Sequence, residues 1–206
     1  MNNSVKLPTK KEAEEILSWA YQQNPGMWEK HSRIAARAAQ SIAENCGLDP
    51  DRAYICGLLH DIGRYEGNRG LHHIYAGYEL MMNKNYTSIA EVCLSHSFPF
   101  QDIGAYGGGD IDCNDEELSV ITTYLSKATY SDYDKLIQLC DAISLAQGIC
   151  LIDMRVLDVI RRYGFNDFTL LKLDSIFSLK KYFDTMCGKN IYDLFYDEIR
   201  EITFHA

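Results

Sequence analysis

The stretch "GLLHDIGRYEG", residues 57–67, places a histidine and an aspartate side by side at the end of an apolar helix. Leu58 and Leu59 direct this helix toward a core. An ionisable pair is costly there unless it is hydrogen-bonded, ion-paired or bound to a metal. Asp61 projects roughly 100° further round the helix than His60. One helix end therefore offers a nitrogen and a carboxylate to a common point, and the rest of the chain should supply their partners.

Two further polar residues lie on apolar helical faces. His31, in "MWEKHSRIAARAAQSIA", begins an apolar stripe that continues at Ile34. Asp141, in "YDKLIQLCDAISLAQG", is flanked at i−4 and i+4 by Ile137 and Leu145, so we place it in the middle of a helix. Taken alone, such a histidine is typical of a hydrogen-bonded core residue, and such an aspartate of a partner for a buried arginine.

The four residues together favour a different interpretation. Two histidines and two carboxylates on three inward faces are expensive to bury independently, whereas one shared ion satisfies all of them. A mixed nitrogen and oxygen set suits Mn, Fe, Co, Ni or Zn better than it suits a structural thiolate zinc site. We therefore take His31, His60, Asp61 and Asp141 as candidate metal ligands.

The composition narrows the class of protein. With 206 residues, 47% apolar and 24% charged, the chain is long enough for one globular domain with a sizeable core. Its net charge of −9 argues against a protein that wraps a nucleic-acid duplex, since such a protein needs a broad basic surface. A small phosphorylated ligand remains compatible, because a bound cation reverses the local field.

Cysteine usage and hydropathy indicate the compartment. Seven cysteines are scattered without a C-x-x-C pair, which is typical of reduced thiols in a cytosolic protein. The N-terminal stretch has no apolar signal region, and nowhere do ~18 apolar residues run together. We expect a cytoplasmic protein with no membrane partner.

Capping residues, prolines and glycines divide the chain into helices. Thr9 with Glu12 predicts a capping box, and Asn24-Pro25 and Asp49-Pro50 predict the next two helix starts. The expected helices cover about 9–22, 25–47, 50–63, 72–83, 88–97, 115–127, 132–147, 154–163, 170–187 and 191–202. We predict a single all-α domain over 1–206, with a core at about 24–150. The C-terminal helical extension, about 154–202, either forms a homodimer interface or caps the core.

At its candidate ligands the sequence resembles the HD-domain superfamily of metal-dependent phosphohydrolases. That family is defined by a distant histidine, an adjacent His-Asp pair and a later aspartate on an all-helical core. The matching segments are "EKHSRIA", "ICGLLHDIGR" and "LIQLCDAIS", so the resemblance covers roughly residues 27–147. It implies an HD-type helical core and attack of metal-activated water on a phosphoester or phosphoanhydride.

The segments between the His-Asp pair and Asp141 resemble one group within this superfamily. Two-metal members add histidines there, and His73 in "LHHIYAGYELM" and His96 in "CLSHSFP" match their places. The arrangement is similar to the subgroup that hydrolyses dinucleoside polyphosphates, which implies two Fe or Mn ions, with Co, Ni, Zn or Mg as alternatives. The implied ligands are His31, His60, Asp61 and Asp141 for one metal, and Asp61, His73 and His96 for the other.

Residues beside these ligands have candidate roles of their own. Arg64 is the candidate phosphate contact, because its guanidinium fork suits two phosphate oxygens, while the alternative is a solvated arginine near a helix end. Asp61 or Asp141 is expected to orient the attacking water. Of the adjacent histidines, His72 is expected to be solvated and His73 to be the ligand.

The loop 98–113 follows His96 directly. Its three consecutive glycines exclude regular structure. One interpretation is a lid that places Phe98, Phe100 or Tyr106 on a nucleobase, and the other is a mobile surface loop.

Three functions fit these residues. The first is a hydrolase of a small nucleotide or dinucleotide polyphosphate, with Asp61 and Arg64 as catalytic residues. The second is a sensor module that binds a nucleotide or metal without turnover, and the third is a di-iron oxygenase on the same scaffold. An intact set of six ligands favours the first, because a binding module has no evident need for them. A nucleic-acid polymer is excluded as a partner, since no basic stripe interleaved with aromatic residues is visible.

Overall fold

Helices form almost all of the regular structure in the computed structural model, which describes residues 6–107 and 109–205. The helices are α1 (Lys10–Gln23), α2 (Met27–Cys46), α3 (Pro50–Leu59), α4 (His72–Asn83), α5 (Thr87–Ser95), α6 (Asp115–Lys127), α7 (Asp132–Ala142), α8 (Ile152–Tyr163), α9 (Thr169–Cys187) and α10 (Tyr196–His205). Short 3-10 helices are η1 (Ile62–Glu66), η2 (Ile103–Ala105) and η3 (Ile191–Phe195), and β1 (Ser144–Leu145) pairs antiparallel with β2 (Gly148–Ile149). The predicted all-α class is confirmed.

Local capping explains the starts of α1, α3, α6 and α7. Thr9 and Glu12 form the predicted capping box of α1, and Asp49 accepts backbone N–H bonds at the start of α3. The predicted start of α2 at Pro25 is wrong, because the helix begins at Met27. Asn24 instead caps the end of α1, and its side-chain amide donates to the backbone oxygen of Arg64 at 2.7 Å.

The helix that carries the His-Asp pair ends earlier than predicted. His60 caps α3, and the chain continues in η1 rather than to a helix stop at Gly63. Gly63 serves a different purpose: a Cβ atom there would lie 1.9 Å from the backbone oxygen of His73 and 2.4 Å from the backbone nitrogen of Gly77. Glycine is therefore required for the close approach of η1 to α4.

The last predicted ligand lies near a helix end. Helix α7 stops at Ala142, not at 147, and the chain turns into the β1–β2 hairpin. The predicted mid-helix position of Asp141 is therefore wrong, since it lies in the last turn of α7.

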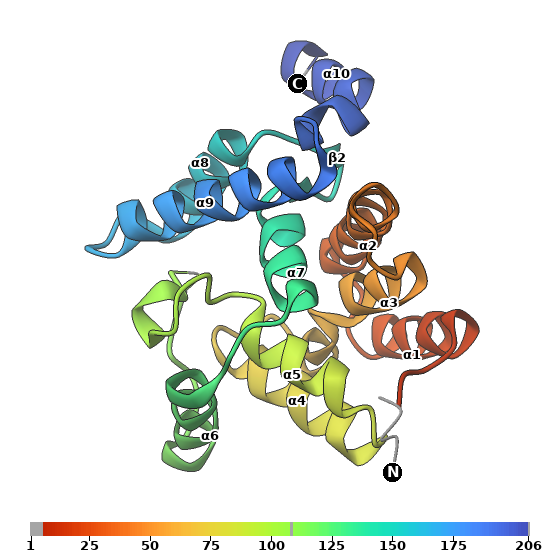
Figure 1. Cartoon of the computed structure of the whole chain (residues 1–206). Coiled ribbons are helices and arrows are strands. Elements are labelled where there is room, and N and C mark those ends of the chain that lie inside the picture. Colours follow the sequence, from red (N-terminus) through yellow and green to blue (C-terminus); the bar gives the residue numbers. More distant parts are fainter. Residues whose placement is uncertain (1–5, 108, 206) are drawn as a thin grey trace.

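The helices surround α7, which lies between the α2–α3 pair and the C-terminal helices (Figure 1). Small side chains allow α2 and α3 to pack closely, and a Cβ atom at Gly57 would lie 2.7 Å from the Cα atom of Ala36. Helix α9 packs on α7 and α2, with Ile176 and Phe183 buried. The C-terminal helices thus cover the core, while a homodimer interface stays a prediction.

The structure also describes the hydropathy of the helices and the state of the cysteines. Among the described residues, none of the helices has the length and apolar character needed to cross a membrane. All seven cysteines are free thiols.

Candidate metal centre

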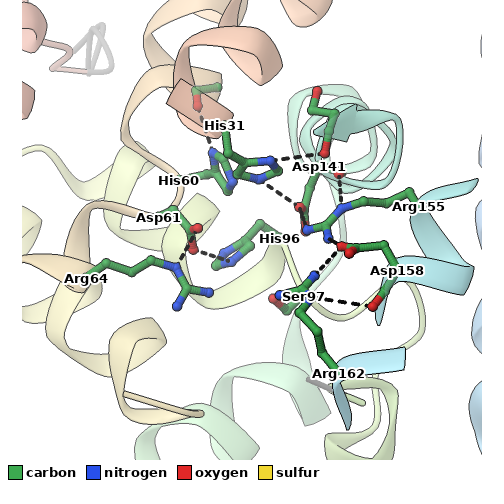
Figure 2. A network of polar contacts seen from close by, with 12 residues as sticks. His31, His60, Asp61, Arg64, His96, Ser97, Asp141, Arg155, Asp158 and Arg162 are labelled. Carbon is green, nitrogen blue, oxygen red and sulfur yellow. Dashed lines mark hydrogen bonds and ion pairs between the residues drawn. The ribbon is translucent and has the colours of Figure 1, made fainter. Parts of the chain in front are cut away.

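Five elements bring the predicted ligands to one place. His60 and Asp61 follow α3, and both are buried. Helices α2, α4 and α7 supply, in turn, His31, His73 and Asp141, and His96 directly follows α5. Figure 2 shows the side chains of His31, His60, Asp61, His96 and Asp141 pointing toward one another.

The ligand atoms form two groups that share one carboxylate. The first group contains His31 and His60 and the second contains His73 and His96, and Asp61 belongs to both. Within each group the ligand atoms lie within 4.8 Å of one another. Asp141 extends the first group, since its Oδ1 atom lies 3.0 Å from Nε2 of His31.

Each of the four histidines is oriented by a backbone carbonyl. The carbonyl is an acceptor, so the facing Nδ1 atom carries the proton and the Nε2 lone pair is left for the centre. This is the outer-shell arrangement of histidines that bind metals. The Nδ1 contacts are His31 to Ser144 O at 3.1 Å, His60 to Gly57 O at 2.7 Å, His73 to Gly70 O at 2.5 Å and His96 to Cys93 O at 2.9 Å.

Two of these Nε2 atoms test whether a metal fits. Nε2 of His60 is buried without a hydrogen-bond partner among the described residues, and Nε2 of His73 is buried 3.1 Å from Oδ1 of Asp61, to which it cannot donate while Nδ1 carries the proton. Burial lowers the pKa of His60 to about 4 and also lowers the pKa of His73, so both rings are neutral at pH 7. A neutral imidazole nitrogen with a free lone pair can bind a metal. The cluster therefore fits a divalent metal ion.

The carboxylates stay ionised because cations and histidines face them. Burial alone raises the pKa of Asp61, but Arg64, followed by His73 and His96, holds it well below its usual range. Arg64 Nε lies 2.7 Å from Oδ2 of Asp61. Burial likewise raises the pKa of Asp141, and His31 with a more distant arginine outweighs it.

The arginine beside Asp141 was not predicted. Nη2 of Arg155, from α8, lies 3.5 Å from Oδ1 of Asp141. Asp141 therefore pairs with an arginine, as one interpretation predicted, and it also faces His31 of the ligand group, while its role as a metal ligand stays a prediction. Arg64 is half-buried, so the alternative of a freely solvated arginine is wrong, and its contact with a phosphate stays a prediction.

His72 is not the solvated histidine that we expected. It is buried, with Nε2 2.8 Å from Glu66 and Nδ1 3.1 Å from Glu117. Burial opposes its charge, but the two glutamates raise its pKa. The expectation failed because Asp112, which accepts the backbone N–H of His72, brings the loop and α6 over the start of α4.

The aromatic residues of loop 98–113 lie in different surroundings. Phe98 is fully buried in a small core with Leu71 and Ile121, so it is unavailable to stack on a base. Phe100 stacks on Phe168 of the turn before α9, with ring centroids 6.3 Å apart. Tyr106 is the candidate that lines the centre, 6.3 Å from the ring of His73. The residues 103–105 form η2, which corrects the expectation of no regular structure, and the lid stays a prediction.

Sequence reasoning missed the cations that the C-terminal helices contribute. Arg155 and Arg162 of α8 join Asp61 and Arg64 in lining a cleft of about 500 Å³. Lys172 of α9 donates to the backbone oxygens of Ser97 at 3.2 Å and Tyr106 at 2.8 Å, and burial lowers its pKa to about 8. The run of basic residues in α8 was visible, but its docking on α7 was not.

The comparison with family models agrees with the ligand geometry. The HD domain model matches residues 28–146, a segment that contains all six ligand candidates and ends before α8. Searches of curated proteins and of solved structures returned no significant match. The match extends over more than half of the sequence, and the His and Asp clusters fit the metal site of such a domain. The chain therefore belongs to the HD domain family.

Proposed function

We propose that the protein is a metal-dependent phosphohydrolase that cleaves a phosphoester or phosphoanhydride bond in a small nucleotide or dinucleotide polyphosphate. The HD family consists mostly of metal-dependent hydrolases, and its hydrolases act on small phosphorylated substrates. The observation that carries the proposal is the convergence of buried histidine Nε2 atoms on the Asp61 carboxylate, beside a cleft lined by arginines.

The proposed ligand sets are those that the resemblance implies. The first metal is held by His31, His60, Asp61 and Asp141, and the second by Asp61, His73 and His96. Fe or Mn is proposed, with Co, Ni, Zn or Mg as alternatives. Bound there, such ions lower the pKa of water toward ~7 and polarise the phosphoryl oxygen.

The arginines are proposed to bind the phosphate. Arg64 uses Nε for Asp61, which leaves its two Nη groups for phosphate oxygens. Arg155 and Arg162 line the same cleft and are held by Asp158 at 3.1 Å and 2.6 Å. In a chain of net charge −9, four arginines therefore line one cleft, which favours the entry of an anionic substrate there.

The carboxylates are proposed to orient the attacking water. Asp61 and Asp141 are both ionised, so each accepts a hydrogen bond from a water at the centre. Arg64 restrains the Asp61 carboxylate from the side opposite the histidines, which holds its free lone pairs in place.

The test combines metal content with turnover. Protein purified without chelators is analysed by inductively coupled plasma mass spectrometry, and phosphate release is measured on mononucleotides and dinucleoside polyphosphates under reducing conditions. We expect about two metals per chain, and phosphate release that metal removal abolishes. His73→Ala should leave about one metal, whereas the matched control His72→Ala should leave both.

Other outcomes would redirect the proposal. One metal per chain, unchanged in His73→Ala, contradicts the binuclear site. Bound metal without phosphate release from any of these compounds contradicts the hydrolase and leaves the sensor module. Oxygen consumption by an iron-loaded protein with a polyol or phosphonate would favour the oxygenase.

A further inference from the structure

A separate group of candidate metal ligands lies where the end of loop 98–113 meets the start of α4. His72 begins α4, Cys113 ends the loop and Glu117 lies in the first turn of α6. One ligand atom of each residue lies within 4.8 Å of the other two. Cys113 and Glu117 are half-buried, so an ion from solution can reach the group.

Backbone contacts hold Cys113 beside His72. The carboxylate of Asp112 accepts the N–H groups of Gly70 and His72 at 3.0 and 2.9 Å. A Cβ atom at Gly70 would lie 2.1 Å from the backbone oxygen of Asp110, so the two segments are in direct contact and glycine is required there. The fold therefore brings the ligand atoms together before any ion binds.

His72 has the contacts of a histidine that binds zinc. Its Nε2 atom lies 2.8 Å from a carboxylate oxygen of Glu66, and its Nδ1 atom lies 3.1 Å from Oε2 of Glu117. When Nε2 donates its proton to Glu66, the Nδ1 lone pair is free for an ion, and a carboxylate behind the ring is the usual outer-shell partner of such a ligand. Neighbouring ligand atoms of a tetrahedral zinc are roughly 3.3 Å apart, so the distance between Nδ1 and Glu117 suits one ion held by both.

The surroundings favour a cation that also binds sulfur. Residues 110–117, "DIDCNDEE", include five acidic residues around one cysteine. Burial, together with Glu117 and Asp112, raises the pKa of Cys113 to about 11, so the thiol is protonated at pH 7 and releases its proton when a metal binds. A thiolate, an imidazole and a carboxylate together suit zinc, whereas Mg and Ca prefer oxygen ligands alone.

We propose that His72, Cys113 and Glu117 bind a zinc ion, with water in the fourth position. The ion ties the end of the loop and α6 to the start of α4, the helix that supplies His73 to the HD centre. None of its ligands belongs to the ligand sets of that centre, so the ion is additional to the metals there and the inference is independent of the proposed function. Because the thiol must first lose a proton, we expect zinc to bind when it is supplied rather than to stay bound through purification.

The first test uses cobalt(II), which replaces zinc and absorbs strongly in the near ultraviolet only when a thiolate binds it. Protein whose HD centre is already loaded is titrated with cobalt and then with zinc. We expect about one cobalt per chain to produce this band and zinc to remove it. Cobalt in the HD centre does not contribute to the band, because the ligands proposed there are nitrogen and oxygen atoms.

Variants identify the ligands in the same titration. Cys113→Ser should abolish the band, and Glu117→Gln should raise the Kd for zinc by about 10-fold or more. Glu116→Gln is the matched control, since Glu116 is exposed in the same helical turn, and it should change neither. A wild-type protein without the band would overturn the site. A band that survives Cys113→Ser would also overturn it, because another thiol would then hold the cobalt.

Thermal unfolding gives a readout that does not depend on absorption. Zinc at 100 times its Kd should raise the Tm of wild type by at least about 5 °C more than that of Cys113→Ser, because an ion bound only to the folded chain stabilises it. His72→Ala should lose this shift and keep the metals of the HD centre. An equal rise of Tm in wild type and Cys113→Ser would show that zinc acts elsewhere and would contradict the site.

Discussion

The HD region, residues 28–146, and the C-terminal helices α8 and α9 contribute different chemical groups to the same centre. The HD region supplies buried ligands, and Asp61, His73 and His96 are each no more than 5% exposed. The C-terminal helices supply cations and apolar walls, and the side chain of Arg162 is 45% exposed. The HD region buries its ligand groups, whereas the C-terminal helices expose their cations to the cleft.

The difference suggests a division of labour between the two regions. Metal ligands require fixed geometry and dry surroundings, which a core of packed helices provides. Substrate contacts tolerate adjustment, and they vary without disturbing the ligands. Substitutions of the metal ligands in the HD region should therefore abolish metal binding and turnover, while substitutions of the cations in α8 and α9 should change affinity.

The largest expected effect follows from the shared ligand. Asp61→Asn should lower the occupancy of both metal sites and reduce phosphate release by at least ~10³-fold, because the carboxylate belongs to both ligand groups. Metal analysis and steady-state kinetics measure the two quantities. Asp174→Asn, the same change at an exposed position of α9, should behave as wild type. If Asp61→Asn kept both metals, the shared carboxylate would be refuted.

A large structural effect is expected where η1 meets α4. The Cβ atom of Gly63→Ala would collide with the backbone of His73, so α4 must shift. We expect a loss of about 1–3 kcal/mol in the free energy of unfolding, and loss of the His73–His96 metal before the other. Urea denaturation and metal analysis report both.

Gly47→Ala is the matched control for that substitution. It strains a left-handed residue with open space around it, so it should lose stability and keep both metals. Wild-type stability and metal content in Gly63→Ala would contradict the close approach of η1 to α4.

How far the sequence predicts the fold depends on whether the cause is local. Thr9 and Asp49 form the expected caps, because a cap needs only its own next three residues. The end of α3 at His60 and the end of α7 at Ala142 were misjudged. The end of α3 depends on a distant segment, since α4 packs on Gly63, whereas α7 ends where the adjoining β1–β2 hairpin begins.

The same distinction applies to the site. The HD ligands were visible because each polar residue interrupts an apolar helical face, and a family resemblance connects them. Arg155 and Lys172 gave no such signal. Their roles depend on how α8 and α9 pack on α7. The spacing of apolar residues within a helix does not predict which other helix it packs on. His72 was misplaced for the same reason, since its two glutamates lie six and 45 residues away.

A smaller effect is expected in the C-terminal helices, where Arg155 of α8 lines the centre. Arg155→Met should raise KM by about 10-fold and leave metal content unchanged, since it removes a phosphate contact and no ligand. Arg161→Met, an exposed change on the same helix, should have no effect. An unchanged KM with altered metal affinity would mean that Arg155 serves only its ion pair with Asp141.

The smallest effect concerns Lys172, whose folded pKa of about 8 lies below its ordinary value of about 10.5. Between these values the unfolded chain binds more protons, so this group's contribution to the free energy of unfolding rises with pH. From pH 7.5 to 9.5, wild type should gain about 2 kcal/mol relative to Lys172→Met in urea denaturation. A constant difference would show that the ammonium group keeps an ordinary pKa. The contact of α9 with the backbone of Ser97 and Tyr106 would then be solvated, and the wall that α9 gives the cleft would be open to water.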